Sequence, residues 1–64
     1  MITLHEFLNV MDLDSNLIIY DNDTFDRLAE GCRDVLDLPY ILYDAKVIHF
    51  TPGIVTKIFV EVID

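Results

Sequence analysis

The sequence predicts a small α+β domain, with an N-terminal helix and a short second helix packed on a three- to four-stranded, mostly antiparallel sheet. Two patterns lead to this fold class. Apolar residues recur at helical spacing near the N-terminus, whereas they alternate with polar residues in the C-terminal third. Because the chain has 64 residues, residues 1–64 are expected to form one domain with a thin core.

The first helix is predicted over residues 3–11. Thr3 precedes Glu6 by three residues, which is the spacing of a capping box, so each side chain can bond the other residue's backbone N–H. Ile2 and Phe7 stand at the positions of a hydrophobic staple. The apolar stripe of this helix consists of Leu4, Phe7, Leu8 and Met11.

Three later segments have the composition of strands. Residues 17–20 are β-branched and aromatic, and residues 45–51 and 56–63 alternate in polarity. The last two are joined through Pro52-Gly53, which suits a type II turn with a positive φ at the glycine. Because type II turns splay a two-residue hairpin, we expect a longer loop.

Residues 24–38 are compatible with two structures. The period of their apolar residues favours one long helix, although Gly31 would cost such a helix about 1 kcal/mol relative to alanine. The alternative is a strand over residues 25–31, paired with the first strand in a hairpin, followed by a short helix over residues 33–38. Pro39 ends whichever helix forms.

Both versions predict the same buried residues. The last strand turns Ile58 and Val60 to the core, which places Phe59 on the more polar face together with Ile63. That face is either covered by a helix or forms a dimer surface. The predicted core consists of Leu4, Phe7, Leu8, Met11, Leu17, Ile19, Leu28, Val35, Leu36, Val47, Ile58 and Val60.

The charge balance is one-sided for a chain of this hydrophobicity. Twelve acidic residues face four basic ones, for a net charge of −8, and 53% of the residues are hydrophobic. Such a chain should fold and present a negative surface, which repels nucleic acid and anionic membranes and favours basic protein partners. The alternative is that the charge serves solubility alone.

The acidic residues concentrate between positions 12 and 37, where Arg27 and Arg33 are the only cations. Carboxylates on a rigid scaffold can imitate a line of phosphates and dock where nucleic acid would bind. Tyrosines could add anchors to this surface, although such residues are more often half-buried packing. The predicted partner-binding residues are Asp12, Asp14, Asp21, Asp23, Asp26, Glu30, Asp34, Asp37, Tyr20, Tyr40 and Tyr43.

Catalytic and metal signatures are weak. The run Asp12-x-Asp14-x-Asn16 resembles the start of a calcium loop, but Leu17 stands where the loop needs glycine. Cys32 and His49 could form a nucleophilic pair by residue type, without any motif to support it. We therefore predict no catalytic residue, metal or cofactor. A single cysteine and no signal peptide indicate a cytoplasmic protein.

Several short segments resemble small acidic proteins encoded by phages and prophages of Gram-positive bacteria. They are Thr3–Leu8, Asn16–Asp21, Leu28–Gly31, Val47–Phe50 and Ile58–Val62, which together span most of the chain. The resemblance implies the hairpin version of residues 24–38. It also implies a link to host-defence inhibitors, including anti-CRISPR proteins, because some small acidic phage proteins act in this way.

These observations lead to three function hypotheses. The leading one is a phage- or mobile-element-encoded binding protein that inhibits a host nucleic-acid-binding or defence protein, with its acidic face competing against nucleic acid. The second is a homodimeric interaction module of a mobile element, without an inhibitory role. The third is a minor enzyme or metal protein that uses Cys32 and His49.

Overall fold

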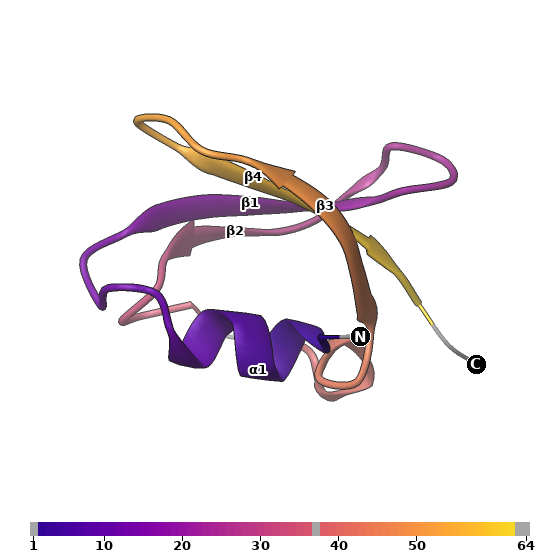
Figure 1. Cartoon of the computed structure of the whole chain (residues 1–64), viewed down its shortest axis with the longest axis horizontal. Helices are drawn as coiled ribbons and strands as arrows, with labels where there is room; N and C mark the ends of the chain where they lie inside the picture. The colour runs from indigo at the N-terminus through magenta and orange to yellow at the C-terminus, as the bar shows by residue number, and fades with distance from the viewer. Residues whose placement is uncertain (1, 37, 63–64) are drawn as a thin grey trace.

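One open sheet and one short helix make up the fold in the computed structural model, which describes residues 2–36 and 38–62. The strands lie in the order β2-β1-β4-β3. Helix α1 and the 3-10 helix η1 lie on one side of the sheet (Figure 1). The elements along the chain are α1 (Leu4–Asn9), β1 (Asn16–Asp21), β2 (Arg27–Cys32), η1 (Tyr40–Leu42), β3 (Lys46–Thr51) and β4 (Thr56–Glu61).

The sheet is mixed, with two antiparallel pairings and one parallel pairing. Strands β1 and β2 pair antiparallel, as do β3 and β4, but the central strands β1 and β4 pair parallel. The segment between β2 and β3 passes below the sheet before β3 begins, so β4 returns in the direction of β1 (Figure 1). Ile19 and Ile58 meet in register at this central pair, so burial of apolar side chains accompanies the parallel contact.

Helix α1 begins with the predicted capping box. The Glu6 backbone N–H donates to Thr3 Oγ1 at 3.3 Å, and the Thr3 backbone N–H donates to Glu6 Oε1 at 3.1 Å. The helix ends at Asn9, two residues earlier than expected, and Val10 has a non-helical backbone as its C-cap. The backbone N–H of Leu4 also donates to the Ala45 carbonyl at 2.8 Å, which ties the start of the helix to the segment before β3.

We expect Thr3→Ala to lower the free energy of unfolding by about 1 kcal/mol, because it removes the acceptor for the Glu6 amide. Hydrogen bonds from the Thr3 backbone and hydroxyl lower the pKa of Glu6 below its ordinary value of 4.5. The stability from this carboxylate is therefore present above pH 4.5 and lost as pH falls through the folded pKa. Urea titrations at pH 7 and pH 3 measure both effects, and an unchanged midpoint at pH 7 would contradict the cap.

The middle of the chain forms the hairpin, and the long-helix interpretation is wrong. The second helix predicted over residues 33–38 is also wrong: residues 33–35 form a turn, and the 3-10 helix η1 follows after Pro39. The backbone N–H groups of Arg33 and Asp34 donate to the carbonyls of Ser15 and Leu13, at 2.7 and 2.8 Å. These amides therefore hold the turn against the loop between α1 and β1 instead of entering a helix.

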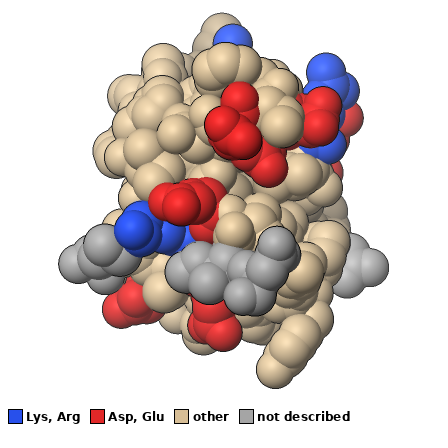
Figure 2. Space-filling view, turned by 90° about the vertical axis from the view of Figure 1, so that its right-hand side faces the viewer, with Lys and Arg blue, Asp and Glu red and all other residues tan. Residues whose placement is uncertain are grey.

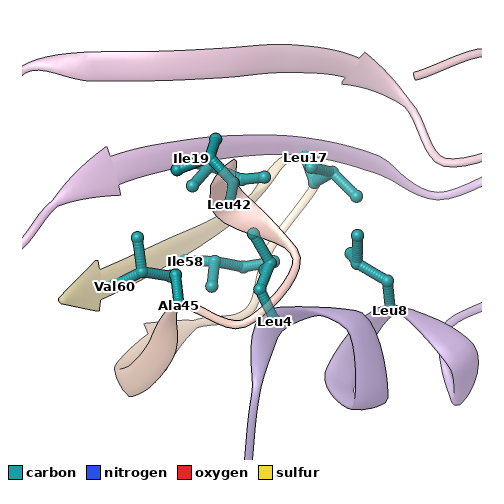
Figure 3. Close-up of a cluster of buried hydrophobic side chains, with 8 residues drawn as sticks. All are labelled: Leu4, Leu8, Leu17, Ile19, Leu42, Ala45, Ile58 and Val60. Carbon is teal, nitrogen blue, oxygen red and sulfur yellow. The ribbon is translucent and has the colours of Figure 1, made fainter. Parts of the chain in front are cut away.

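The core lies between the sheet and the α1–η1 side (Figure 3). Val35 is wrongly predicted as a core residue, because the turn leaves it 75% exposed. Leu42 and Ala45 take part in the core instead, since η1 brings both beneath the sheet. The buried residues are Leu4, Leu8, Leu17, Ile19, Leu42, Ala45, Ile58 and Val60. The remaining predicted core residues, Phe7, Met11, Leu28, Leu36 and Val47, are partly buried against this cluster.

The loop between β3 and β4 spans residues 52–55, so the expectation of more than two loop residues is confirmed. The type II turn is wrong, because Gly53 has no positive φ. Among the described glycines the positive φ belongs to Gly31, at 147°. Strand β4 ends at Glu61, so the prediction of a strand through residue 63 is wrong at Val62, and Ile63 lies outside the described residues. Within the described ranges, no helix has the length and apolar character required to span a bilayer.

Candidate functional site

Three of the predicted partner-binding carboxylates lie together at the turn between β1 and β2. Asp21 is the last residue of β1, and Asp23 and Asp26 follow within the turn. Asp23 and Asp26 are exposed, whereas Asp21 is partly buried. This turn projects from one end of the sheet (Figure 1).

Hydrogen bonds within the turn hold two of these carboxylates in place. Asp21 Oδ1 accepts from the backbone N–H groups of Asp23 and Thr24, at 2.8 and 3.3 Å. Thr24 Oγ1 donates to Asp26 Oδ2 at 3.0 Å and accepts from the Asp26 backbone N–H at 3.3 Å. The positions of the negative charges are therefore set before any partner arrives.

The same turn forms a polar hollow with the end of β4. The hollow has a volume of ≈ 450 Å³, and the Asn22 backbone N–H donates to the Val60 carbonyl at 2.8 Å, which joins the two segments. Figure 2 shows this end of the molecule, where red carboxylate groups lie in several separate places and blue groups lie beside some of them. The hollow is lined by Asp21, Asn22, Asp23, Glu61 and Val62. Among the described residues, however, no group of three His, Cys, Asp or Glu side chains is arranged to hold a metal ion.

The other predicted acidic residues do not join this cluster. Asp12 and Asp14 lie in the loop before β1, and backbone hydrogen bonds place Asp34 beside that loop, at the opposite end of the β1–β2 hairpin. Glu30 lies on β2 and its carboxylate is paired with Arg27 at 2.8 Å. Asp37 falls outside the described residues. The acidic segment therefore forms two separate end clusters rather than one line of charges.

The three predicted tyrosines are also divided. Tyr20 lies on β1, and its side chain points away from the core because its neighbour Ile19 is buried. Tyr40 and Tyr43 lie at η1, beneath the opposite face, and their rings stack with centroids 5.9 Å apart. Tyr43 also stacks on His5 at 5.4 Å. Only Tyr20 is therefore on the same hairpin as the carboxylates of the turn.

A row of side chains crosses the uncovered face of the sheet. Arg27, Tyr20, Phe59 and His49 come from β2, β1, β4 and β3, and they are mutual partners in the strand register. The Tyr20 and Phe59 rings stack with centroids 5.2 Å apart, and His49 stacks on Phe59 at 4.3 Å. Phe25 meets Phe59 edge-on from the turn, with centroids 6.2 Å apart. We call these five residues the cross-strand row.

Tyr20 was among the predicted partner-binding residues and Phe59 was predicted on the face away from the core, whereas neither Phe25 nor His49 was predicted as a surface residue. Alternation in the last strand was the signal that placed Phe59 opposite the core. His49 is exposed on this face and stacks on Phe59, because an irregularity between Val47 and His49 shifts the register of β3. No sequence pattern indicates that Phe25 adopts a φ of 62° and lies over Phe59.

The sheet face that carries the cross-strand row also carries most of the basic residues in the described chain. Lys57 lies on this face because it alternates with buried Ile58, and Lys46 reaches Glu61 at 3.9 Å. Arg27 is paired with Glu30, which raises the pKa of the guanidinium above its usual value by accepting its hydrogen bond. Arg33 is different: its Nε donates to the Leu8 carbonyl at 2.8 Å on the covered side.

Cys32 and His49 cannot form a nucleophilic pair in this fold. Cys32 ends β2 and His49 lies in β3, and these are the two edge strands of the sheet. Three strand spacings of about 4.8 Å separate the edges by roughly 14 Å, whereas a thiolate–imidazole pair needs hydrogen-bond contact. Cys32 Sγ instead donates to the Leu13 carbonyl at 3.2 Å.

Comparison with known proteins adds no family to this description. No family model matches the chain, and neither the curated proteins nor the solved structures include a significant match.

Proposed function

We propose that the chain is a binding protein without catalysis, which presents the carboxylates of the β1–β2 turn to a basic protein surface. The observation that carries this proposal is that hydrogen bonds within the turn hold the carboxylates of Asp21 and Asp26 in place, with the exposed Asp23 between them. Within residues 2–36 and 38–62, none of these three carboxylates forms an ion pair. They remain available to arginine and lysine side chains of a partner.

A nucleic-acid-binding protein is the class of partner that best suits this turn. Its binding groove is lined with arginine and lysine side chains that neutralise phosphates, and preorganised carboxylates can occupy the same donors. The net charge of −8 supports fast, electrostatically guided encounter with such a surface. The protein would then act by competing with nucleic acid for its partner.

The narrower function is inhibition of a host defence protein by a phage- or mobile-element-encoded chain. Its sole support is the resemblance of the short sequence segments described above to small acidic phage proteins. The acidic turn is compatible with this role and equally with another basic partner. The carboxylates at the far end of the hairpin, Asp12, Asp14 and Asp34, provide an internal comparison for the experiment that follows.

We expect the triple variant Asp21→Asn, Asp23→Asn, Asp26→Asn to bind its partner roughly 5- to 100-fold more weakly. Losing three exposed ion pairs costs about 1–3 kcal/mol in all. The partner is captured on immobilised wild-type protein from a Gram-positive bacterial lysate at low salt, identified by mass spectrometry and purified. Its affinity is then measured by calorimetry at 50 and 300 mM salt, where wild-type binding should weaken steeply.

The matched control is Asp12→Asn, Asp14→Asn, Asp34→Asn, which removes the same formal charge from the opposite end of the hairpin. This variant should keep most of the affinity. Equal losses in both variants would mean that only net charge matters, and binding that is indifferent to salt would exclude nucleic-acid mimicry. Either result contradicts the assignment of the turn as the binding site.

A further inference from the structure

In the part of the chain that the structure describes, no helix packs over one face of the sheet, and Phe25 of the β1–β2 turn contacts this face at Phe59. The helix and η1 lie on the other side of the sheet (Figure 1). The cross-strand row lies on the open side, because Tyr20 and Phe59 alternate with buried Ile19 and Ile58. His49 is exposed and Phe25 is 66% exposed, although both are engaged in aromatic contacts. Tyr20 and Phe59 are partly exposed. A partly exposed aromatic row of this kind is typical of an interaction surface.

The backbone at Phe25 supports the same interpretation. Phe25 has a φ of 62°, a region that costs a residue with a side chain roughly 1–2 kcal/mol. Glycine or asparagine would relieve this cost in a turn. The strained conformation places the phenyl ring against Phe59, which lies between Tyr20 and His49 in the row, so it extends the aromatic surface at the expense of local stability.

The charges on this face indicate which kind of partner would bind to it. Arg27 and Glu30 are paired near the β2 edge, Lys46 and Glu61 lie together across the sheet, and Lys57 adds one further cation. The face is therefore nearly balanced in charge, although the whole chain carries −8. Two copies of so acidic a protein repel each other least when they approach through this surface.

We propose that the open face binds a second copy of the chain, sheet against sheet, in a symmetric dimer. In such an interface the same patch is used twice, so both copies must offer complementary groups from one surface. This face does so, with apolar rings at its centre and both signs of charge toward its edges. The stacked rings turn their faces toward one another across the strands, so their edges meet the partner's row.

The size of the face predicts a weak dimer. Strands about 4.8 Å apart with a rise of about 3.3 Å per residue make a four-stranded, six-residue sheet face of roughly 400 Å². Stable interfaces bury about 800 Å² on each partner. We therefore expect a dissociation constant on the order of 0.1 mM, with dimers at high protein concentration and monomers at low concentration.

Sedimentation equilibrium between about 10 µM and 1 mM tests the dimer itself. Wild type should change from monomer to dimer over this range. His49→Glu places a negative charge at the β3 end of the row, beside the Phe59 ring, and should weaken association at least tenfold. Ile54→Glu is the matched control, because it adds the same charge at a 97% exposed position in the β3–β4 loop and should have little effect. Equal losses, or a wild-type monomer at 1 mM, would overturn the proposal.

Fluorescence tests which face is used. The chain has no tryptophan, so Tyr20→Trp introduces a single reporter into the row. Its emission should shift to shorter wavelength as the protein dimerises. Tyr40→Trp puts the same reporter beneath the opposite face, at an 89% exposed position, and its emission should not change. The reverse pattern would assign the dimer to another surface and overturn the proposal.

The salt response separates this dimer from the binding proposed above. Added salt screens the repulsion between two acidic copies, so self-association should strengthen between 50 and 300 mM salt. Binding of a basic partner at the turn should weaken over the same range. Self-association that weakens with salt would overturn the proposal, because it would mean that opposite charges rather than the apolar row hold the copies together. Loss of partner binding alone would leave the dimer intact.

Discussion

Ile58→Ala is expected to lower the free energy of unfolding by about 2–5 kcal/mol. Ile58 is fully buried in the central strand β4, where it meets Ile19 of β1 and Phe50 of β3 in register. Removing its side chain leaves a cavity between the sheet and α1. Because a 64-residue domain has a thin core, this loss is a large share of a total stability near the low end of ~5–15 kcal/mol.

Thermal and urea unfolding followed by circular dichroism measure this effect. Ile54→Ala is the control, because the same side chain is removed from a position that is 97% exposed in the β3–β4 loop. Its effect should stay within about 0.5 kcal/mol of wild type. If the two variants unfold at the same midpoint, β4 does not occupy the centre of the sheet and the fold described above is incorrect.

Gly31→Ala is expected to cost about 1–3 kcal/mol through the backbone alone. Gly31 lies in β2 opposite Leu17 and has a φ of 147°, a conformation that residues with a side chain rarely adopt. Space is not the obstacle, because an added Cβ would meet Leu36 Cδ1 at 3.6 Å, an ordinary contact. The loss should therefore appear although the new methyl group fits.

Gly53→Ala is a closely matched control. An added Cβ at Gly53 would meet the Val55 carbonyl oxygen at the same distance of 3.6 Å, but the φ of Gly53 is not positive. This variant should be neutral or slightly stabilising, by up to about 1 kcal/mol, because alanine restricts the unfolded chain. Urea titrations compare the two, and a harmless Gly31→Ala would contradict the backbone assigned to β2.

Local patterns predicted some elements correctly. The capping box at Thr3 and Glu6 depends on residues three positions apart, so its hydrogen bonds follow from sequence spacing. Alternation in the last strand correctly separated Ile58 and Val60 from Phe59. The same alternation left open whether a helix covers the face that carries Phe59. Within the described residues no helix covers it, because α1 and η1 lie on the other side of the sheet. That open face is now the proposed dimer surface.

The sequence was a poorer guide to which of the predicted site residues lie together in space. Asp21, Asp23 and Asp26 are neighbours in the chain, so their proximity follows from the turn. Asp12 and Asp14 are close to them in sequence as well, yet the length of β1 carries these residues to the other end of the hairpin. A strand of six residues spans roughly 20 Å, so charges that seem contiguous in a sequence are separated in space.

Short-range chemistry in the chain established where α1 starts, which segments favour strands and how strongly acidic the protein is. Contacts between distant segments decided the rest. Period alone favoured a helix over residues 24–38, but Leu17 and Ile19 pair with β2 and the amides of the following turn bond to the α1–β1 loop. These long-range hydrogen bonds and the burial of apolar side chains outweigh helix propensities of less than about 1 kcal/mol per residue, and no local pattern reports them.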